Sequence, residues 1–195
     1  AETASTLAEM IVADAALKAT TDPDRRLALL DSRLQRTVAF LMNIYARYLF
    51  EVEFYAARRN GPLTVAQLNS LMEAAQKRAF LNGLGSWHPL FWASKLHFYL
   101  TTVPFYNFPY TFGYLFSAAV YVRAREASQG FEGLCEAVLR DTGRMRVEDL
   151  ARVHLGLDLT REDAWADAVE LVTQDVDEFV ALARRVATTG TAERG

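Results

Sequence analysis

The residues best suited to chemistry are a histidine and three tyrosines near the middle of the chain: His97, Tyr106, Tyr110 and Tyr114. The tyrosines follow one another at intervals of four residues, with a proline and a glycine among them. Tyrosine hydroxyls and an imidazole at the wall of a dry cleft can donate hydrogen bonds to a developing oxyanion. The other interpretation is a buried aromatic wall without chemistry, because aromatic side chains dominate protein cores.

A second candidate lies at the start of the chain, in the segment AETASTLAE. Glu2 and Glu9 are seven residues apart and therefore share one face of a helix, with Ser5 and Thr6 between them. Carboxylates with this spacing can bind a metal ion together with ligands from elsewhere. The other interpretation is an exposed acidic face, since charged residues are mostly exposed.

The sequence contains no complete catalytic motif. Its three histidines, His88, His97 and His154, are too far apart in sequence for a metal-binding spacing. The patterns H-E-x-x-H, C-x-x-C, G-x-x-x-x-G-K-[ST] and G-x-S-x-G do not occur. The single cysteine, Cys135, cannot form an internal disulfide, which favours a cytoplasmic protein.

The composition limits the fold class and the partners. A chain of 195 residues suits one domain or half of a larger enzyme. With 51% hydrophobic and 23% charged residues, the composition excludes a disordered chain. The formal charge of -3 offers no general attraction to nucleic acid phosphates or anionic lipid. Residues 96–122 contain no Asp, Glu, Lys or Arg, but their prolines and polar side chains argue against a membrane span. We therefore expect neither nucleic acid nor a membrane as a partner.

Apolar residues at spacings of three and four predict an all-α fold. Asp22 before a proline and Thr64 three residues before a glutamine are helix-start signals, and Thr160 is the expected cap of the last helix. No alternating strand pattern is convincing, and residues 97–109 are expected to be irregular or a short extended segment. The expected helices span residues 1–20, 23–59, 64–80, 110–128, 131–141, 146–155 and 161–187, and the tail over 188–195 should fray.

The predicted helix over residues 23–59 is the longest element. About 37 residues at 1.5 Å each would give a helix of roughly 55 Å. Its middle, TVAFLMNIYARYLF, is apolar almost all round, so we expect it to be packed on several sides.

The two candidate features, in this order, resemble the C-terminal part of the oligoendopeptidase F family of zinc metallopeptidases, which are relatives of thimet oligopeptidase. The most specific piece is PFYNFPYTFGYLFS, residues 104–117, preceded by HFY at residues 97–99. The segment AETAS at residues 1–5 is shorter, and it stands at the end where the family would place it. The resemblance extends over essentially the whole chain.

The resemblance implies a zinc endopeptidase that hydrolyses short peptides between helical lobes. Glu2 matches the glutamate that is the family's third zinc ligand, so the implied cofactor is a zinc ion. His97, Tyr106 and Tyr110 match the family's cleft residues, which bind the substrate backbone and stabilise the tetrahedral intermediate. Tyr114 is placed in the same set.

Residues 1–195 lack the H-E-x-x-H helix, the general base and the N-terminal lobe of that family. The resemblance therefore implies that residues 1–187 are the C-terminal helical part of a catalytic domain, a multi-helix catalytic-lobe fragment that is inactive alone. Its partners would be short peptide substrates and the missing N-terminal part, and uncovered apolar surface would favour self-association. The alternative is a non-enzymatic helical interaction module that kept the fold and lost the chemistry.

Overall fold

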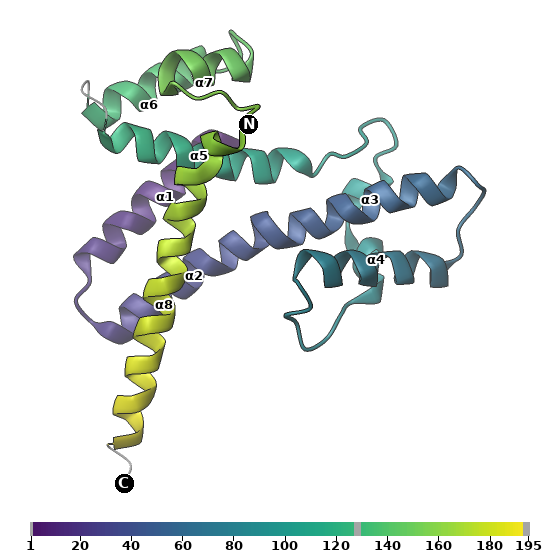
Figure 1. Ribbon diagram of the computed structural model, residues 1–195, viewed down its shortest axis with the longest axis horizontal. Coiled ribbons are helices and arrows are strands. Elements are labelled where there is room, and N and C mark those ends of the chain that lie inside the picture. Colours follow the sequence, from purple (N-terminus) through teal and green to yellow (C-terminus); the bar gives the residue numbers. More distant parts are fainter. Residues whose placement is uncertain (1, 127–129, 193–195) are drawn as a thin grey trace. The chain divides into compact units, whose positions relative to one another are not determined.

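The computed structural model describes residues 2–126 and 130–192 and, of residues 188–192, the backbone alone. These residues form helices joined by turns, without a β-strand, so the predicted all-α class is confirmed (Figure 1). Among the described helices, none combines the length and the apolar character that a bilayer crossing requires.

The chain divides into two compact units. The first unit comprises Ala1–Gln35 and Gly113–Gly195, and the second unit comprises Arg36–Phe112. Each unit has its own buried apolar cluster, and each is described by itself below.

The first unit is built from helices close to the predicted ones. Asp22 caps α2, because its carboxylate accepts hydrogen bonds from the backbone N–H groups of Asp24 and Arg25 at 2.9 and 3.3 Å. Leu17, Leu30 and Leu182 form its buried cluster. The elements that lie wholly or mostly in this unit are α1 (Glu2–Ala19), α2 (Pro23–Val38), α5 (Phe108–Glu126), α6 (Gly130–Asp141), α7 (Val147–Leu155), a 3₁₀ turn η4 (Glu162–Trp165) and α8 (Ala166–Ala192).

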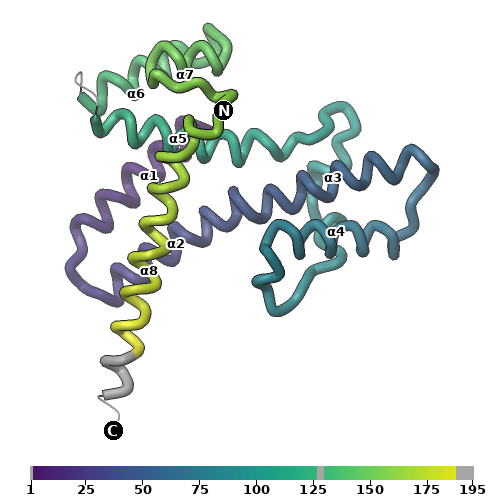
Figure 2. The backbone as a smooth tube through the Cα atoms, in the orientation of Figure 1, coloured from purple at the N-terminus to yellow at the C-terminus, as the bar shows by residue number. Residues whose placement is uncertain are grey.

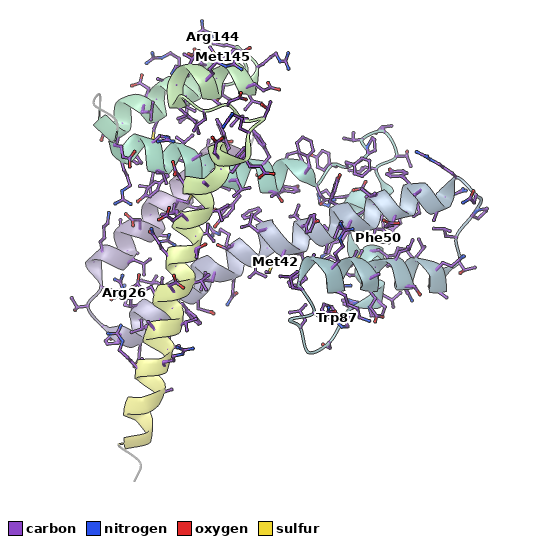
Figure 3. The ribbon with its side chains drawn as sticks, in the orientation of Figure 1. Arg26, Met42, Phe50, Trp87, Arg144 and Met145 are labelled. Carbon is purple, nitrogen blue, oxygen red and sulfur yellow. The ribbon has the colours of Figure 1, made fainter. Side chains whose placement is uncertain are left out.

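The second unit is a helical hairpin with an irregular segment packed against it. The helices α3 (Ile44–Arg58) and α4 (Val65–Ala79) run side by side, as the trace in Figure 2 shows. Thr64 and Gln67 form the predicted capping box at the start of α4. Phe50 lies on the side of α3 that faces α4 (Figure 3) and belongs to the buried cluster of this unit. Its other buried members are Ala46, Leu49, Met72, Ala75 and Ala79.

The predicted single helix over residues 23–59 is helical throughout but is divided by a π-helical segment, η1 (Ala39–Asn43), between α2 and α3. The longest α-helix is instead α8, with 27 residues. In a π-helix the backbone hydrogen bonds join residues five apart rather than four apart. Within this π-helical segment, the carbonyl of Phe40 also accepts a hydrogen bond from the Thr111 hydroxyl at 2.6 Å. The expectation of packing on several sides was wrong for one face, because Tyr45 and Tyr48 remain 40% and 44% exposed.

Three boundaries differ from the predictions. Thr160 does not cap the last helix, because its hydroxyl donates to the Asp158 carboxylate at 2.7 Å and Arg161 holds the cap position of η4. Residues 97–107 are irregular, one of the two alternatives predicted for residues 97–109, with a 3₁₀ turn, η3 (Leu96–Tyr99), followed by turns. The following helix, α5, begins at Phe108 rather than at residue 110. The last helix continues to Ala192 rather than ending at 187, and residues 193–195 lie outside the described part.

The start of α1 lies directly against α5 in the first unit. A Cβ atom added to Gly113 would stand 2.9 Å from the Cβ of Glu2, so only glycine permits this approach. One turn further along, the Thr6 and Ser117 hydroxyls share a short hydrogen bond, and Ser117 also donates to the Thr3 carbonyl at 3.0 Å. Small residues and paired hydroxyls therefore fix α1 on α5.

Replacing Gly113 by alanine should weaken this contact. Overpacking costs about 1–3 kcal/mol, which exceeds the roughly 0.5–1 kcal/mol that alanine gains over glycine inside a helix. We expect Gly113→Ala to lower the midpoint of urea unfolding, measured by circular dichroism. Gly85→Ala is the control, because nothing lies within 4 Å of its added Cβ. Equal midpoints for Gly113→Ala and the unmodified protein would contradict the close approach.

Candidate functional site

Three of the predicted site residues, His97, Tyr106 and Tyr110, contact one another in the second unit. The imidazole Nε2 of His97 lies 3.2 Å from the hydroxyl of Tyr110. The His97 ring stacks on the Tyr106 ring at 5.4 Å between centroids and meets the Tyr110 ring edge-on at 5.8 Å. The 3₁₀ turn η3 carries the histidine, the first turn of α5 carries Tyr110, and Tyr106 lies on the connection between them.

That connection, residues 100–107, is called the tyrosine loop here, and two side chains of α3 hold it. The backbone N–H of Phe105 donates to Glu51 Oε1 at 2.8 Å. Arg47 Nη1 donates to Asn107 Oδ1 at 3.1 Å. Arg47 and Glu51 are four residues apart and therefore share one face of α3. The loop is thus fastened at two points to a single helix face.

Phe105 makes the sharpest bend of the loop. Its φ of 57° lies in the left-handed region, which is uncommon for a bulky residue. The ring of Phe105 contacts the rings of Tyr48 and Tyr55 on α3, with centroids 5.8 and 5.4 Å away. Ring packing and the hydrogen bond to Glu51 together keep Phe105 in this conformation.

Glu51 is a buried carboxyl group with an unusual environment. It is 4% exposed, and its second oxygen, Oε2, has no hydrogen-bond partner among the described residues. Burial raises the pKa of Glu51, and the hydrogen bond from Phe105 opposes that shift only in part. The protonated form of Glu51 is therefore favoured over a wider pH range than in water.

Two cationic side chains, Arg47 and Lys95, lie near enough to His97 to affect its pKa. Lys95 Nζ and Arg47 Cζ lie 4.4 and 5.4 Å from the centroid of the Phe91 ring. Burial lowers the pKa of His97, and the charges of Arg47 and Lys95 lower it further. His97 is accordingly a neutral imidazole at neutral pH, next to two cations.

A side-chain amide of α4 positions the segment that carries Phe91. Gln76 Nε2 donates to the His88 carbonyl at 2.9 Å, and the His88 N–H donates to Gln76 Oε1 at 3.2 Å. The 3₁₀ turn η2 (Pro89–Ser94) begins directly after this pair and presents Phe91 to Arg47. His88 therefore has a structural role through its backbone, as expected for a loop residue.

The other two predicted site residues, Glu2 and Tyr114, lie in the first unit. Glu2 is half-buried in the first turn of α1, where its backbone approaches Gly113. Tyr114, the next residue on α5, is 6% exposed. Glu9 is exposed. Within residues 2–126 and 130–192, no group of three His, Cys, Asp or Glu side chains could hold a metal ion.

Sequence reasoning missed four residues around His97: Arg47, Glu51, Lys95 and Asn107. A signal for two of them was present, because Arg47 and Glu51 are charged residues one turn apart in a mostly apolar helical stretch. Charges at such positions need buried partners. Those partners lie on the tyrosine loop, more than 50 residues further along the chain.

A cavity in the first unit is chemically separate from these residues. It has a volume of about 570 Å³ and lies between α5 and α8. Three of its charged lining residues form ion pairs with one another. Arg123 Nη2 lies 2.9 Å from Asp167 Oδ2, and Arg123 Nη1 lies 3.9 Å from Glu126 Oε2. We assign no chemistry to this cavity.

Comparison of the chain with protein-family models, with curated proteins and with solved structures found no match.

The buried carboxyl of Glu51 makes a pH-dependent contribution to stability. Because its folded pKa is raised, the protonated group favours folding below the unfolded pKa of about 4.3, and this contribution is lost as pH rises through the folded pKa. Glutamine keeps an acceptor for the Phe105 N–H without the charge. We expect Glu51→Gln to raise the melting temperature by about 2–4 °C at pH 8, or roughly 1 kcal/mol, and by little at pH 4.

Thermal unfolding at pH 4 and pH 8, followed by circular dichroism, measures this difference. Glu53→Gln is the matched control, because Glu53 is an exposed carboxylate on the same helix. A gain for Glu51→Gln of the same size at both pH values would show that the charge is not its source.

Proposed function

We propose that this chain is part of the catalytic domain of a zinc endopeptidase that acts on short peptides, of the oligoendopeptidase F type. One observation carries the proposal: the order HFY, at residues 97–99, followed by PFYNFPYTFGYLFS, at residues 104–117. The meeting of His97 with Tyr106 and Tyr110 supports it, because a catalytic segment must bring these side chains together.

In this proposal Tyr110 donates a hydrogen bond to the oxyanion that forms when a peptide carbonyl is attacked. His97 Nδ1 is buried without a partner among the described residues, and an unpaired acceptor there is more tolerable than an unpaired N–H donor. The neutral imidazole therefore carries its proton on Nε2 and donates it to the Tyr110 oxygen. Because the Tyr110 oxygen accepts this hydrogen bond, its own hydroxyl proton points away from the imidazole and can be donated to the substrate oxyanion.

Tyr106 has the complementary role of binding the substrate backbone. Its side chain is 43% exposed while one side of the ring stacks on His97. A ring fixed on one side and open on the other can present its hydroxyl to a peptide at little entropic cost. The fixed position comes from the tyrosine loop and its two attachments to α3.

The described residues do not form a zinc site by themselves, since no three potential ligands lie together. Glu2 would be the one ligand from this chain, and the proposal requires the remaining ligands and the general base on a segment with H-E-x-x-H. Such a segment does not occur in residues 1–195.

The test is peptide hydrolysis by the product of the complete gene, measured with a quenched fluorescent peptide. Removing one oxyanion donor typically costs about 10²–10³ in kcat. We expect Tyr110→Phe to lower kcat by this factor with little change in KM, because the donor acts in the transition state. Phenylalanine retains the ring, so the melting temperature should change little. Tyr106→Phe and His97→Ala are measured alongside.

Tyr45→Phe is the matched control, because Tyr45 is exposed on α3 and should leave kcat unchanged. Wild-type kcat in both Tyr106→Phe and Tyr110→Phe would reject the oxyanion assignment. Absence of peptidase activity from the complete gene product supplied with zinc would reject the proposed function.

A further inference from the structure

Two cationic side chains converge beside His97 from different elements. Arg47 comes from α3, and Lys95 lies between the 3₁₀ turns η2 and η3. Both cations lie over the ring of Phe91, at 5.4 and 4.4 Å from its centroid. Burial lowers the pKa of Lys95, and the nearby charge of Arg47 lowers it further.

Neither cation has a carboxylate partner among the described residues, whereas other arginines, such as Arg33 and Arg161, form ion pairs with aspartates. Arg47 donates to two neutral amides, Asn43 Oδ1 at 3.0 Å and Asn107 Oδ1 at 3.1 Å, which leave its charge uncompensated. The carboxyl one turn away, Glu51, instead accepts from the Phe105 N–H. Burial lowers the pKa of Arg47 as well, as expected for a cation without an anion nearby.

Two like charges held together and partly desolvated are unfavourable unless an anion joins them. We propose that Arg47 and Lys95 form a binding site for a carboxylate group of a short peptide, beside His97 and Tyr110. Arg47 and Lys95 contact the same aromatic ring, and the guanidinium and the ammonium both carry N–H donors that suit a carboxylate. The two positive charges alone imply that the ligand is an anion. Its identification as a peptide carboxylate rests on the proposed function.

Peptide carboxylates have two sources, the C-terminus and acidic side chains, and four peptides separate them. The first pair is acetyl-Ala-Phe-Ala as free acid and as C-terminal amide. The second pair is acetyl-Ala-Glu-Ala-amide and acetyl-Ala-Gln-Ala-amide. Binding to the 195-residue chain is measured by calorimetry at low ionic strength without added metal, because surface charges are screened by salt. We expect one pair to show at least about tenfold tighter binding for the member with the carboxylate.

Lys95→Gln is the principal variant, because the side chain of Lys95 makes no hydrogen bond to the tyrosine loop and its loss should not disturb the fold. It should remove most of the carboxylate preference, and Arg47→Gln should do the same. Arg58→Gln, an exposed arginine in the last turn of α3, is the control and should leave the preference intact. Circular dichroism of each variant checks that it is folded.

A second readout comes from His97, whose pKa is lowered by burial and further by the charges of Arg47 and Lys95. A bound carboxylate neutralises part of that charge, so the pKa of His97, followed by its NMR ring resonances, should rise when the binding peptide is added. Equal binding within both pairs, or a full preference in Lys95→Gln, would overturn the carboxylate site. Because no turnover or metal is involved, this result is independent of whether the complete gene product hydrolyses peptides.

Discussion

The candidate site depends on one partly buried hydrogen bond, from the backbone N–H of Phe105 to the buried carboxyl group of Glu51. A bulky residue at φ 57° is unfavourable by about 1–3 kcal/mol, so surrounding contacts must hold Phe105 there. The Glu51 bond does so together with the rings of Tyr48 and Tyr55. The bend carries the next residue, Tyr106, onto the ring of His97. The stacked pair is therefore a consequence of a buried carboxyl group on a neighbouring helix.

The same constraint explains the charge distribution. Arg47 and Glu51 are opposite charges one turn apart, which commonly pair on a helix surface. Here each binds the tyrosine loop instead, one through Asn107 and the other through Phe105. The loop thus separates a potential ion pair, and the positive charge of Arg47 remains next to Lys95 and the neutral His97. In a partly desolvated place such charges act more strongly on a ligand than they would in water.

The first unit positions its helices by a different device. Gly113 and the Thr6–Ser117 hydroxyl pair allow α1 and α5 to approach closely, which brings the backbone of Glu2 against α5. Close packing of small residues tolerates little added volume, whereas the buried polar contacts of the second unit depend on satisfied hydrogen bonds. The two kinds of contact respond to different perturbations, the first to side-chain size and the second to protonation.

The sequence by itself determined the helical class, most helix positions and the caps at Asp22 and Thr64, because these follow from interactions within about four residues. It also identified His97, Tyr106 and Tyr110 as candidates, but not their supports. The bond between Glu51 and Phe105 joins residues 54 apart, and that between Phe40 and Thr111 joins residues 71 apart. Such pairs have no local signature, so only the tertiary structure decided the π-helical segment, the bend at Phe105 and the division into two units. The predicted cap at Thr160 was wrong even though the competing contact is local: the Thr160 hydroxyl donates to the carboxylate of Asp158, two residues away.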